Sequence, residues 1–134
     1  MRMTHEADYA LRIVYTLARR QKQLSAKTLS DETGVTIRFT LKILRRLSEC
    51  KIVAANKGAS GGYYLTADLS ELSLGHIIEC IDGPLKINHC LSDDFDCTRV
   101  ADKHRCPFHC LLADISDELR ERLYSAKIIN FINK

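Results

Sequence analysis

A glycine-rich stretch between two short apolar runs restricts the fold of this chain more than any other feature. The runs Ile52–Ala55 and Tyr63–Thr66 have the length of strands, and the segment Asn56–Gly62 between them reads NKGASGG. This pattern predicts a β-hairpin with a flexible tip. Because the glycines lead into a strand and not into a helix N-terminus, a phosphate-binding nucleotide loop is disfavoured. A hairpin tip with one cation, Lys57, is typical of a DNA-binding wing, whose glycines let the backbone approach the sugar-phosphate.

Three helical patterns precede the hairpin. The first follows Thr4, which can act as an N-cap, and its apolar positions are Ala7, Ala10, Leu11, Val14, Leu17 and Ala18. A short second helix is expected from Ser25 to Thr33, before Gly34, where a left-handed residue can end it. The third is expected from about Thr36, its cap, to about Cys50. Its predicted buried face consists of Ile37, Leu41, Leu44 and Leu47.

The third helix also carries a basic stripe. Arg38, Lys42 and Arg45 lie at positions i, i+4 and i+7, with Arg46 adjacent. Two helices joined by a tight glycine turn, the second with such a stripe, indicate a helix-turn-helix. The alternative is a solvated face without a ligand. The predicted DNA contacts are Thr36 and Arg38 in the major groove, Lys42 and Arg45 on phosphates, and Lys57, Ser60 and Gly61 in the adjacent minor groove.

Charge is divided unevenly along the chain. Residues 1–60 have a net charge of +7 and residues 61–134 a net charge of −4, whereas the whole chain is only +3. A basic first half suits phosphate neutralisation. No apolar run reaches the length of a membrane span, and acidic residues stand where a signal peptide would be apolar, so we expect a cytoplasmic protein without membrane contact. No nucleophile–base pair is identifiable, and we expect no enzyme activity.

The second half predicts two further helices and a long loop. Ser73 can cap a short helix whose apolar side is formed by Leu74, Ile77, Ile78 and Ile81. A loop of roughly twenty residues, from about Leu85 to Arg105, is too long for a passive connection, so we expect an inorganic group to order it. The last helix begins near Cys106 and Pro107 and carries an apolar stripe of Leu111, Ile115, Leu119 and Leu123. That stripe indicates a dimer contact, with packing inside the chain as the alternative.

Four cysteines and a histidine lie close together in the acidic half: Cys90, Cys97, Cys106, His109 and Cys110. Six residues separate Cys90 from Cys97 and eight separate Cys97 from Cys106, whereas structural zinc sites use tighter cysteine pairs. Widely spaced thiolates on a loop suit a larger inorganic cluster better. A cytosolic protein is expected to keep its cysteines as thiols or to commit them to metal or redox chemistry. We expect Cys50 and Cys80 to be free, small buried hydrophobes.

In these residues the chain resembles the iron–sulphur winged-helix transcription regulators, the family of IscR, NsrR and RirA, and most closely its NsrR- and RirA-like members. The likeness covers essentially the whole chain. It includes MRMTHEADYALR at the N-terminus, FTLKILRRL in the third helix, the wing KGASGGYYLT, the short helix LSLGHIIECIDG and three cysteines in order.

The resemblance implies a mainly α fold with a small β-hairpin. Residues 1–82 would form a winged helix-turn-helix, 83–105 a cysteine-rich cluster-binding loop, and 106–134 a long C-terminal dimerisation helix. It also implies a homodimer that regulates transcription, as a repressor, at a double-stranded DNA operator. A [4Fe–4S] or [2Fe–2S] cluster would be held by Cys90, Cys97 and Cys106.

The fourth ligand of such a cluster is open among three residues. Asp8 matches the position where NsrR-type members supply an aspartate, His109 matches the ligand histidine of IscR-type members, and Cys110 is a candidate by spacing alone. The N-terminal likeness favours Asp8, supplied from the opposite subunit. The chain departs from the family where Lys51 replaces a glycine and Lys57 replaces an arginine of the wing.

The expected function is a DNA-binding regulator whose operator binding is switched by a cluster that senses nitric oxide, iron or redox state. One alternative is a cluster-free DNA-binding regulator in which Cys106 and Cys110 form a zinc or thiol–disulphide element. The other is a small iron–sulphur electron carrier. The wing and the lack of a compact ferredoxin-type cysteine run argue against the carrier.

Overall fold

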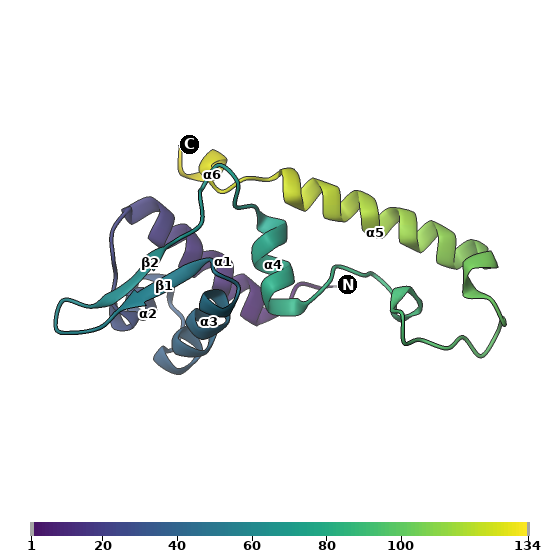
Figure 1. Ribbon diagram of the computed structural model, residues 1–134, viewed down its shortest axis with the longest axis horizontal. Helices are drawn as coiled ribbons and strands as arrows, with labels where there is room; N and C mark the ends of the chain where they lie inside the picture. Colours follow the sequence, from purple (N-terminus) through teal and green to yellow (C-terminus); the bar gives the residue numbers. More distant parts are fainter. Residues whose placement is uncertain (1, 134) are drawn as a thin grey trace.

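A computed structural model describes residues 2–133 as a winged helix-turn-helix from which one long helix extends (Figure 1). The elements are α1 (His5–Arg20), α2 (Ala26–Thr33), α3 (Ile37–Glu49), β1 (Val53–Asn56), β2 (Gly62–Leu65), α4 (Leu74–Asp82), the 3-10 turns η1 (His89–Leu91) and η2 (Lys103–Arg105), α5 (Pro107–Ser125) and α6 (Ile129–Ile132). The predicted fold class, mainly α with one small hairpin, is confirmed.

The first four helices begin at hydroxyl side chains. The hydroxyls of Thr4, Ser25, Thr36 and Ser73 each accept a hydrogen bond from the backbone N–H three residues later. These bonds satisfy donors that a helix leaves without a partner at its N-terminus. Gly34 ends α2 with φ +72°, the left-handed conformation predicted for it. The turn between α2 and α3 is therefore the tight one that a helix-turn-helix requires.

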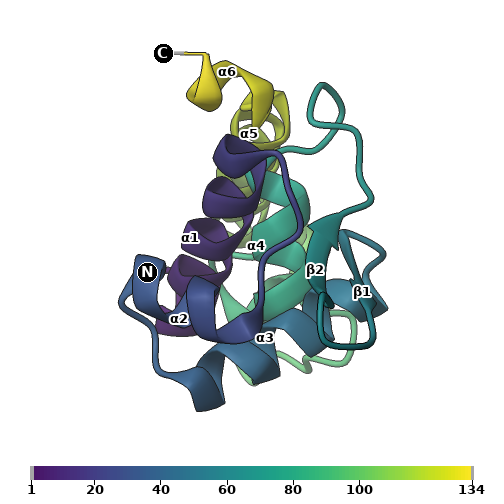
Figure 2. The ribbon, with the colours of Figure 1, turned by 90° about the vertical axis from the view of Figure 1, so that its left-hand side faces the viewer.

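The hairpin pairs in antiparallel register, with Val53 opposite Leu65 and Asn56 opposite Gly62. Just before it, Lys51 adopts φ +60°, a backbone region that favours glycine. Glycine would adopt this conformation without strain, and this chain makes the turn with a lysine. Figure 2 shows the hairpin to one side of α1 and α4, which pack against each other above α2 and α3.

The core lies between α1, α2, α3 and α4. Its largest fully buried side chains are Ile13, Leu17, Leu29, Ile43, Leu44, Leu47 and Ile77. The buried face of α3 differs in part from the predicted one, because Ile37 and Leu41 are 46% and 47% exposed. Thr40 and Ile43 are buried instead. A threonine can occupy the core here because its hydroxyl donates to the carbonyl oxygen of Val35 at 3.4 Å.

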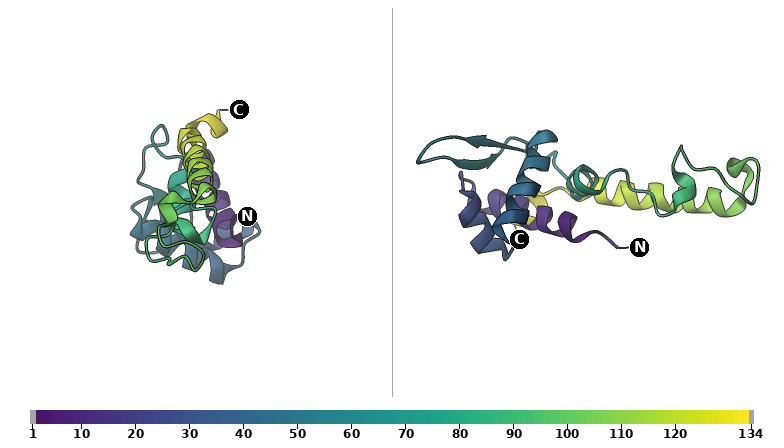
Figure 3. Two further views of the ribbon diagram at one scale, coloured as in Figure 1. Left: turned by 90° about the vertical axis from the view of Figure 1, so that its right-hand side faces the viewer. Right: turned by 90° about the horizontal axis from the view of Figure 1, so that it is seen from below.

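Helix α5 points away from the winged helix, so that it and the hairpin lie at opposite ends of the molecule (Figure 3). The helix ends at Ser125 and does not continue to the C-terminus. The chain then returns to the core, where Ile128 is buried and its N–H donates to the carbonyl oxygen of Leu72 at 2.8 Å. None of the helices in residues 2–133 is both long and apolar enough to cross a bilayer.

Candidate nucleic-acid interface and cysteine loop

The outward face of α3 is basic. The buried residues of this helix define the side that faces the core, and Arg38 and Arg45 project on the opposite side, where both are exposed. Thr36 stands at the N-terminus of the same helix, and its hydroxyl accepts the Phe39 N–H at 3.4 Å. A hydroxyl that accepts this bond still has its own proton to donate to an outside acceptor.

Two cations of the predicted stripe, Lys42 and Arg45, are paired with carboxylates. The ammonium of Lys42 lies 2.7 Å from Glu6 of α1, and the guanidinium of Arg45 lies 3.4 Å from Glu49. Exposed ion pairs of this kind contribute about 0–1 kcal/mol. Either cation can therefore exchange its carboxylate for a phosphate at little cost. The roles predicted for Lys42 and Arg45 stay predictions.

Ile37 and Leu41 lie beside these arginines on the exposed part of α3. Sequence reasoning placed them in the core because they are apolar and match the helical period. An apolar side chain that faces outward beside cations can contact the methyl group of a thymine in the major groove. The exposed face of α3 therefore combines charged and apolar groups of the kinds that base readout uses.

The tip of the hairpin holds the predicted wing residues. Lys57 and Ser60 are exposed, and the N–H of Gly61 donates to the carbonyl oxygen of Gly58 at 2.9 Å. A Cβ at Gly61 would lie 2.4 Å from the carbonyl oxygen of Asn56, closer than packing allows. Glycine is thus required at this position by the tight closure of the tip.

Two residues that sequence reasoning missed support the wing. Leu24, between α1 and α2, exchanges backbone hydrogen bonds with Tyr63 at 2.9 and 2.7 Å. The side-chain amide of Gln23 donates to the carbonyl oxygen of Ser60 and accepts from Asn56, each at 2.6 Å. The only signal in the sequence was a single apolar leucine in a polar turn, so this contact could not be foreseen.

Protein groups order the long loop between α4 and α5. The ammonium of Lys103 donates to the carbonyl oxygens of Ser92 and Phe95 at 2.6 and 3.3 Å. The N–H of Ile87 donates to the hydroxyl of Ser116 at 3.0 Å, which ties the start of the loop to α5. These hydrogen bonds contribute to the order of the loop, and the inorganic group that its length led us to expect stays a prediction.

The loop carries the three predicted cluster ligands as free cysteines. Cys90 and Cys97 are half-buried, and Cys106 is buried at the N-terminus of α5. The Sγ atom of Cys90 accepts a hydrogen bond from the Asn88 amide at 3.1 Å, and that of Cys106 accepts one from the Arg99 guanidinium at 2.8 Å. The loop thus presents thiols that already interact with donors.

The surroundings of Cys106 favour its thiolate form. The backbone N–H of His109 lowers the pKa of Cys106, and the N–H of Phe108 and the guanidinium of Arg99 add to this effect, whereas burial opposes it. The pKa of Cys106 therefore lies below that of an ordinary cysteine. Helix N-termini and nearby cations favour the thiolate, which is the form that binds metals.

The three candidate fourth ligands lie in different surroundings. The Asp8 carboxylate pairs with Arg12 on the next turn of α1 at 2.8 Å. His109 is 8% exposed, its ring packs edge-on against His104, and its Nδ1 atom has no hydrogen-bond partner within residues 2–133. Cys110 is exposed and donates to the carbonyl oxygen of His104 at 3.2 Å. Of the three candidates, His109 is therefore the one whose ligand atom, Nδ1, is not already engaged in a hydrogen bond or an ion pair within residues 2–133.

The fold does not bring the candidate ligand side chains together within residues 2–133. In the part of the chain that the structure describes, no three histidine, cysteine, aspartate or glutamate side chains lie close enough to hold a metal ion. The donor types suit an iron–sulphur cluster, but their arrangement in the single subunit does not fit one. The roles predicted for Cys90, Cys97 and Cys106 stay predictions.

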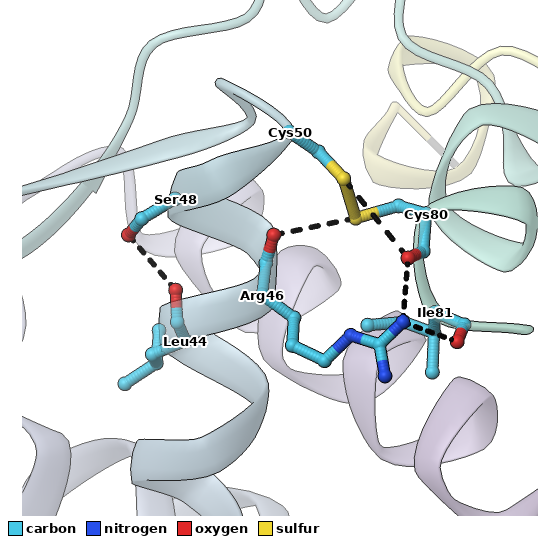
Figure 4. The surroundings of a disulfide bond; sticks show 6 residues. All are labelled: Leu44, Arg46, Ser48, Cys50, Cys80 and Ile81. Carbon is cyan, nitrogen blue, oxygen red and sulfur yellow. Dashed lines mark hydrogen bonds between the residues drawn. A yellow bond between two sulfur atoms is a disulfide. The ribbon is translucent and has the colours of Figure 1, made fainter.

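Cys50 and Cys80 form a disulphide, so the prediction that both are free, buried cysteines was wrong. Cys50 is exposed at the C-terminal end of α3, and packing against α4 brings the two Cα atoms to 6.2 Å, within bonding range. Arg46 lies at the same place and donates to the carbonyl oxygens of Cys80 and Ile81 at 3.3 and 2.8 Å (Figure 4). Its guanidinium therefore caps the end of α4 and is turned away from the outward face of α3.

Glu79 joins α4 to α5. Its side chain is 16% exposed and accepts hydrogen bonds from Arg120 at 2.9 and 3.2 Å, from the Leu85 N–H at 3.1 Å and from the Tyr124 hydroxyl. Burial alone would raise the pKa of Glu79, but these hydrogen bonds outweigh burial and lower the pKa to about 2. An ionised Glu79 thus fixes the direction in which α5 leaves the winged helix.

Comparison with known proteins relates the whole chain to transcriptional regulators. Residues 3–134 match the pattern of the Rrf2 family, described as iron-dependent transcriptional regulators. A helix-turn-helix-type transcriptional regulator of Mycobacterium tuberculosis (strain CDC 1551 / Oshkosh) is 36% identical over 87 residues, 63% of this chain and 54% of that protein. The match thus spans about half the length of this relative. IscR of Serratia proteamaculans is 25% identical over 141 residues, covering 99% of this chain and 80% of IscR.

Solved structures share the fold. CymR of B. subtilis, called its global cysteine regulator, superposes with a TM-score of 0.78 and 19% identity, covering 99% of this chain and 97% of CymR. T. potens IscR superposes with a TM-score of 0.75 and 18% identity, covering 99% and 87% of the two chains. At this level of identity the likeness extends to the winged-helix architecture and no further.

Proposed function

The chain belongs to the Rrf2 family of transcriptional regulators, and we propose that it acts as a homodimer that binds a double-stranded DNA operator through α3 and the wing. The observation that carries this proposal is the exposed face of α3. Arg38 and Arg45 project there beside two outward apolar side chains, at the end of the molecule where the hairpin also lies. A basic helix next to a glycine-tipped hairpin is suited to adjacent major and minor grooves.

Each predicted contact has a separate physical role. Thr36 and Arg38, at the N-terminal end of α3, reach base edges or phosphates, and Lys42 and Arg45 bind phosphates once they leave their carboxylates. Lys57 and Ser60 enter the minor groove, which the backbone at Gly61 can approach closely because it has no Cβ. The charge that this surface neutralises makes binding dependent on salt.

The proposed dimer contact lies on α5. Phe108, Leu111, Ile115 and Leu119 form an apolar stripe that is exposed in the single chain. A soluble monomer rarely leaves a contiguous apolar surface of this kind in water. A second copy of α5 against this stripe would remove it from water and would set two α3 helices at a fixed spacing for two half-sites.

The proposed sensing element is the cysteine loop. An iron–sulphur cluster, [4Fe–4S] or [2Fe–2S], held by Cys90, Cys97 and Cys106 is supported by the free state of these three thiols and by the lowered pKa of Cys106. Because the thiols are apart in the single chain, the loop must close up when it binds a cluster. Asp8, His109 and Cys110 remain the candidates for a fourth ligand, and nitric oxide, iron supply or redox state for the signal.

A cluster-free regulator is the second candidate function. The observation that favours it is the separation of the loop thiols in residues 2–133, together with a fold that the cysteine regulator CymR shares. Cys106 and Cys110 would then act through zinc or through thiol oxidation. Either version leaves the DNA-binding surface unchanged and places the protein in the cytoplasm.

Fluorescence anisotropy with duplex DNA tests the proposed interface. We expect Arg38→Ala to weaken binding to a selected operator by roughly five- to 150-fold, the range for loss of one good base contact. Lys86→Ala is the matched control, because it removes one charge from the segment after α4, and it should leave affinity unchanged. Binding that responds neither to salt nor to Arg38→Ala would contradict the proposal.

Anaerobic purification tests the proposed cofactor. A brown protein with iron and sulphide, lost in a Cys106→Ser variant, supports the cluster. A colourless protein that contains zinc, or only free thiols, supports the cluster-free regulator. Operator affinity measured on the same preparations with and without nitric oxide tests the signal, and identical affinity in every state excludes the loop as a switch.

A further inference from the structure

We propose that Cys50 and Cys80 form a redox-reversible dithiol–disulphide site that holds the C-terminal end of α3 against α4. The effect of this site on DNA rests on the proposed function, because α3 is the helix that would enter the major groove. The site is separate from the cysteine loop, in which Cys90, Cys97, Cys106 and Cys110 are all free.

The position of the bond gives it a mechanical role. Cys50 ends α3, and Cys80 lies near the end of α4, 30 residues further along the chain (Figure 4). Directly after Cys50, Lys51 makes the left-handed turn that leads into the hairpin. One covalent bond therefore fixes the point at which the chain passes from the recognition helix to the wing.

Each of the two sulphur atoms also lies near a carbonyl oxygen that could accept a hydrogen bond from the reduced thiol. The Sγ atom of Cys80 lies 3.5 Å from the carbonyl oxygen of Arg46, and that of Cys50 lies 4.0 Å from the carbonyl oxygen of Cys80. When the bond is reduced, each new S–H thus has a carbonyl within reach of a weak hydrogen bond. The Arg46 guanidinium keeps its bonds to α4 in both forms, so reduction loosens the contact between the two helices without abolishing it.

Exposure decides how the bond is opened. Cys50 is exposed and Cys80 is half-buried, so an external thiolate meets the sulphur of Cys50. A dithiol attacks Cys50, the S–S bond breaks, and its electron pair leaves on Cys80, which takes up a proton. The second thiol of the reductant then releases Cys50 as a thiol and departs as a disulphide. Two electrons and two protons have moved from the dithiol to the site.

A peroxide can close the bond again. The Cys50 thiol attacks one peroxide oxygen, which gives a sulphenic acid and one water, and the Cys80 thiol then displaces the second water as the S–S bond forms. Disulphides in reducing compartments are usually transient and redox-sensing, so a bonded pair beside the recognition helix of a cytoplasmic regulator has a regulatory rather than a purely structural role.

Mass spectrometry and hydrogen exchange test the site without DNA. A variant that combines Cys90→Ser, Cys97→Ser, Cys106→Ser and Cys110→Ser retains only the Cys50–Cys80 pair. Wild-type protein is mapped by differential alkylation in parallel. We expect dithiothreitol to expose two alkylatable thiols and hydrogen peroxide to remove them again. Amides at the end of α3, among them the Cys50 N–H bonded to Arg46, should exchange about threefold faster or more after reduction.

Operator binding tests the regulatory effect. We expect the reduced form to bind about fivefold more weakly, the lower end of typical coupling between sites, because the recognition helix is less well fixed. Cys50→Ser, at an exposed position, should bind like the reduced protein under both conditions. A pair that does not oxidise in the folded protein, unchanged exchange, or equal affinity of the two forms overturns the proposal. If neither form binds DNA, the proposed function fails, and the exchange data still decide whether the pair holds α3.

Discussion

Within residues 2–133, two residues with side chains adopt the left-handed backbone conformation, Gln21 with φ +51° and Lys51 with φ +60°. Gln21 ends α1, and Lys51 turns the chain from α3 toward β1. A Cβ in this region is strained by roughly 1 kcal/mol or more. Lys51 lies between the recognition helix and the wing. Its backbone could relax to an unstrained conformation only if α3 or the hairpin shifted.

Lys51→Gly is expected to raise the free energy of unfolding by roughly 0.5–1 kcal/mol, because glycine relieves the strain and loses only part of the gain through its freer unfolded chain. Urea unfolding measures the change. Lys51→Ala is the matched control, since it removes the same charge but keeps the Cβ, and it should show no such gain. Equal stability of the two variants would contradict the argument.

Gly75 permits the close contact between α4 and α5. A Cβ built on Gly75 would lie 2.2 Å from a ring carbon of Tyr124, which cannot be accommodated without moving α5. Gly75→Ala should therefore lower the free energy of unfolding by about 1–3 kcal/mol, as overpacking typically does. Calorimetry measures the loss, and Gly75→Ala combined with Tyr124→Ala should cost less than the two single changes added together. Additive losses would contradict the proposed clash between a Cβ at position 75 and the Tyr124 ring.

Single residues also show where sequence reasoning succeeds. Thr4, Thr36 and Ser73 were predicted as caps because a hydroxyl before an apolar period has one favourable use. Ile37 and Leu41 were misplaced because an apolar period cannot reveal which of two neighbouring faces is buried. Cys50 and Cys80 were misjudged for a different reason, because their contact depends on how α3 packs on α4.

At the scale of elements, α4 connects the parts of the molecule that a regulator must couple. It packs on α1 in the core, is joined to α3 by Arg46 and the disulphide, and is joined to α5 by Glu79. The cysteine loop begins where α4 ends. A change in the loop can therefore reach α3 through one short helix.

The Glu79 contact predicts a dependence of stability on pH. Its pKa is lowered from 4.5 to about 2 in the folded protein, so its stabilisation is complete above pH 4.5 and is lost as pH falls from there through about 2. Glu79→Gln should lose about 2–3 kcal/mol at neutral pH, and the gap between variant and wild type should close below pH 4.5. Urea unfolding between pH 7 and pH 3 measures this gap. A gap of constant size would show that the carboxylate charge has no part in the contact.

The order of elements was predictable and their tertiary partners were not. The hairpin, α4 and the start of α5 follow from local patterns of apolar residues, glycine and proline. Residues 23 and 24 and the segment after Ser125 gain their roles only from packing on distant strands and helices. The residues proposed to contact DNA belong to predictable elements, whereas the residues proposed as cluster ligands belong to a loop whose shape no periodicity specifies.

At the scale of the whole molecule, the exposed stripe on α5 is the feature that a single chain leaves unexplained. The winged helix has its own core, and α5 extends beyond it with Phe108 and Leu111 facing water. Two chains joined through this helix would act on two half-sites at once. The second half-site is then bound at the high effective concentration that the first one creates.

Ile115→Glu should therefore separate the subunits without unfolding them. The position is exposed in the single chain, so the free energy of unfolding of the monomer should change by no more than about 0.5 kcal/mol. A charge in an apolar contact should weaken the dimer at least about hundredfold, a cost of roughly 3 kcal/mol.

Sedimentation at micromolar concentration should give the mass of one 15.2 kDa chain for the variant and twice that mass for wild type. Glu121→Ala, an exposed change about 120° around α5 from Ile115, is the control and should remain dimeric. A variant that stays dimeric would move the subunit contact away from α5, and with it the spacing of the two recognition helices.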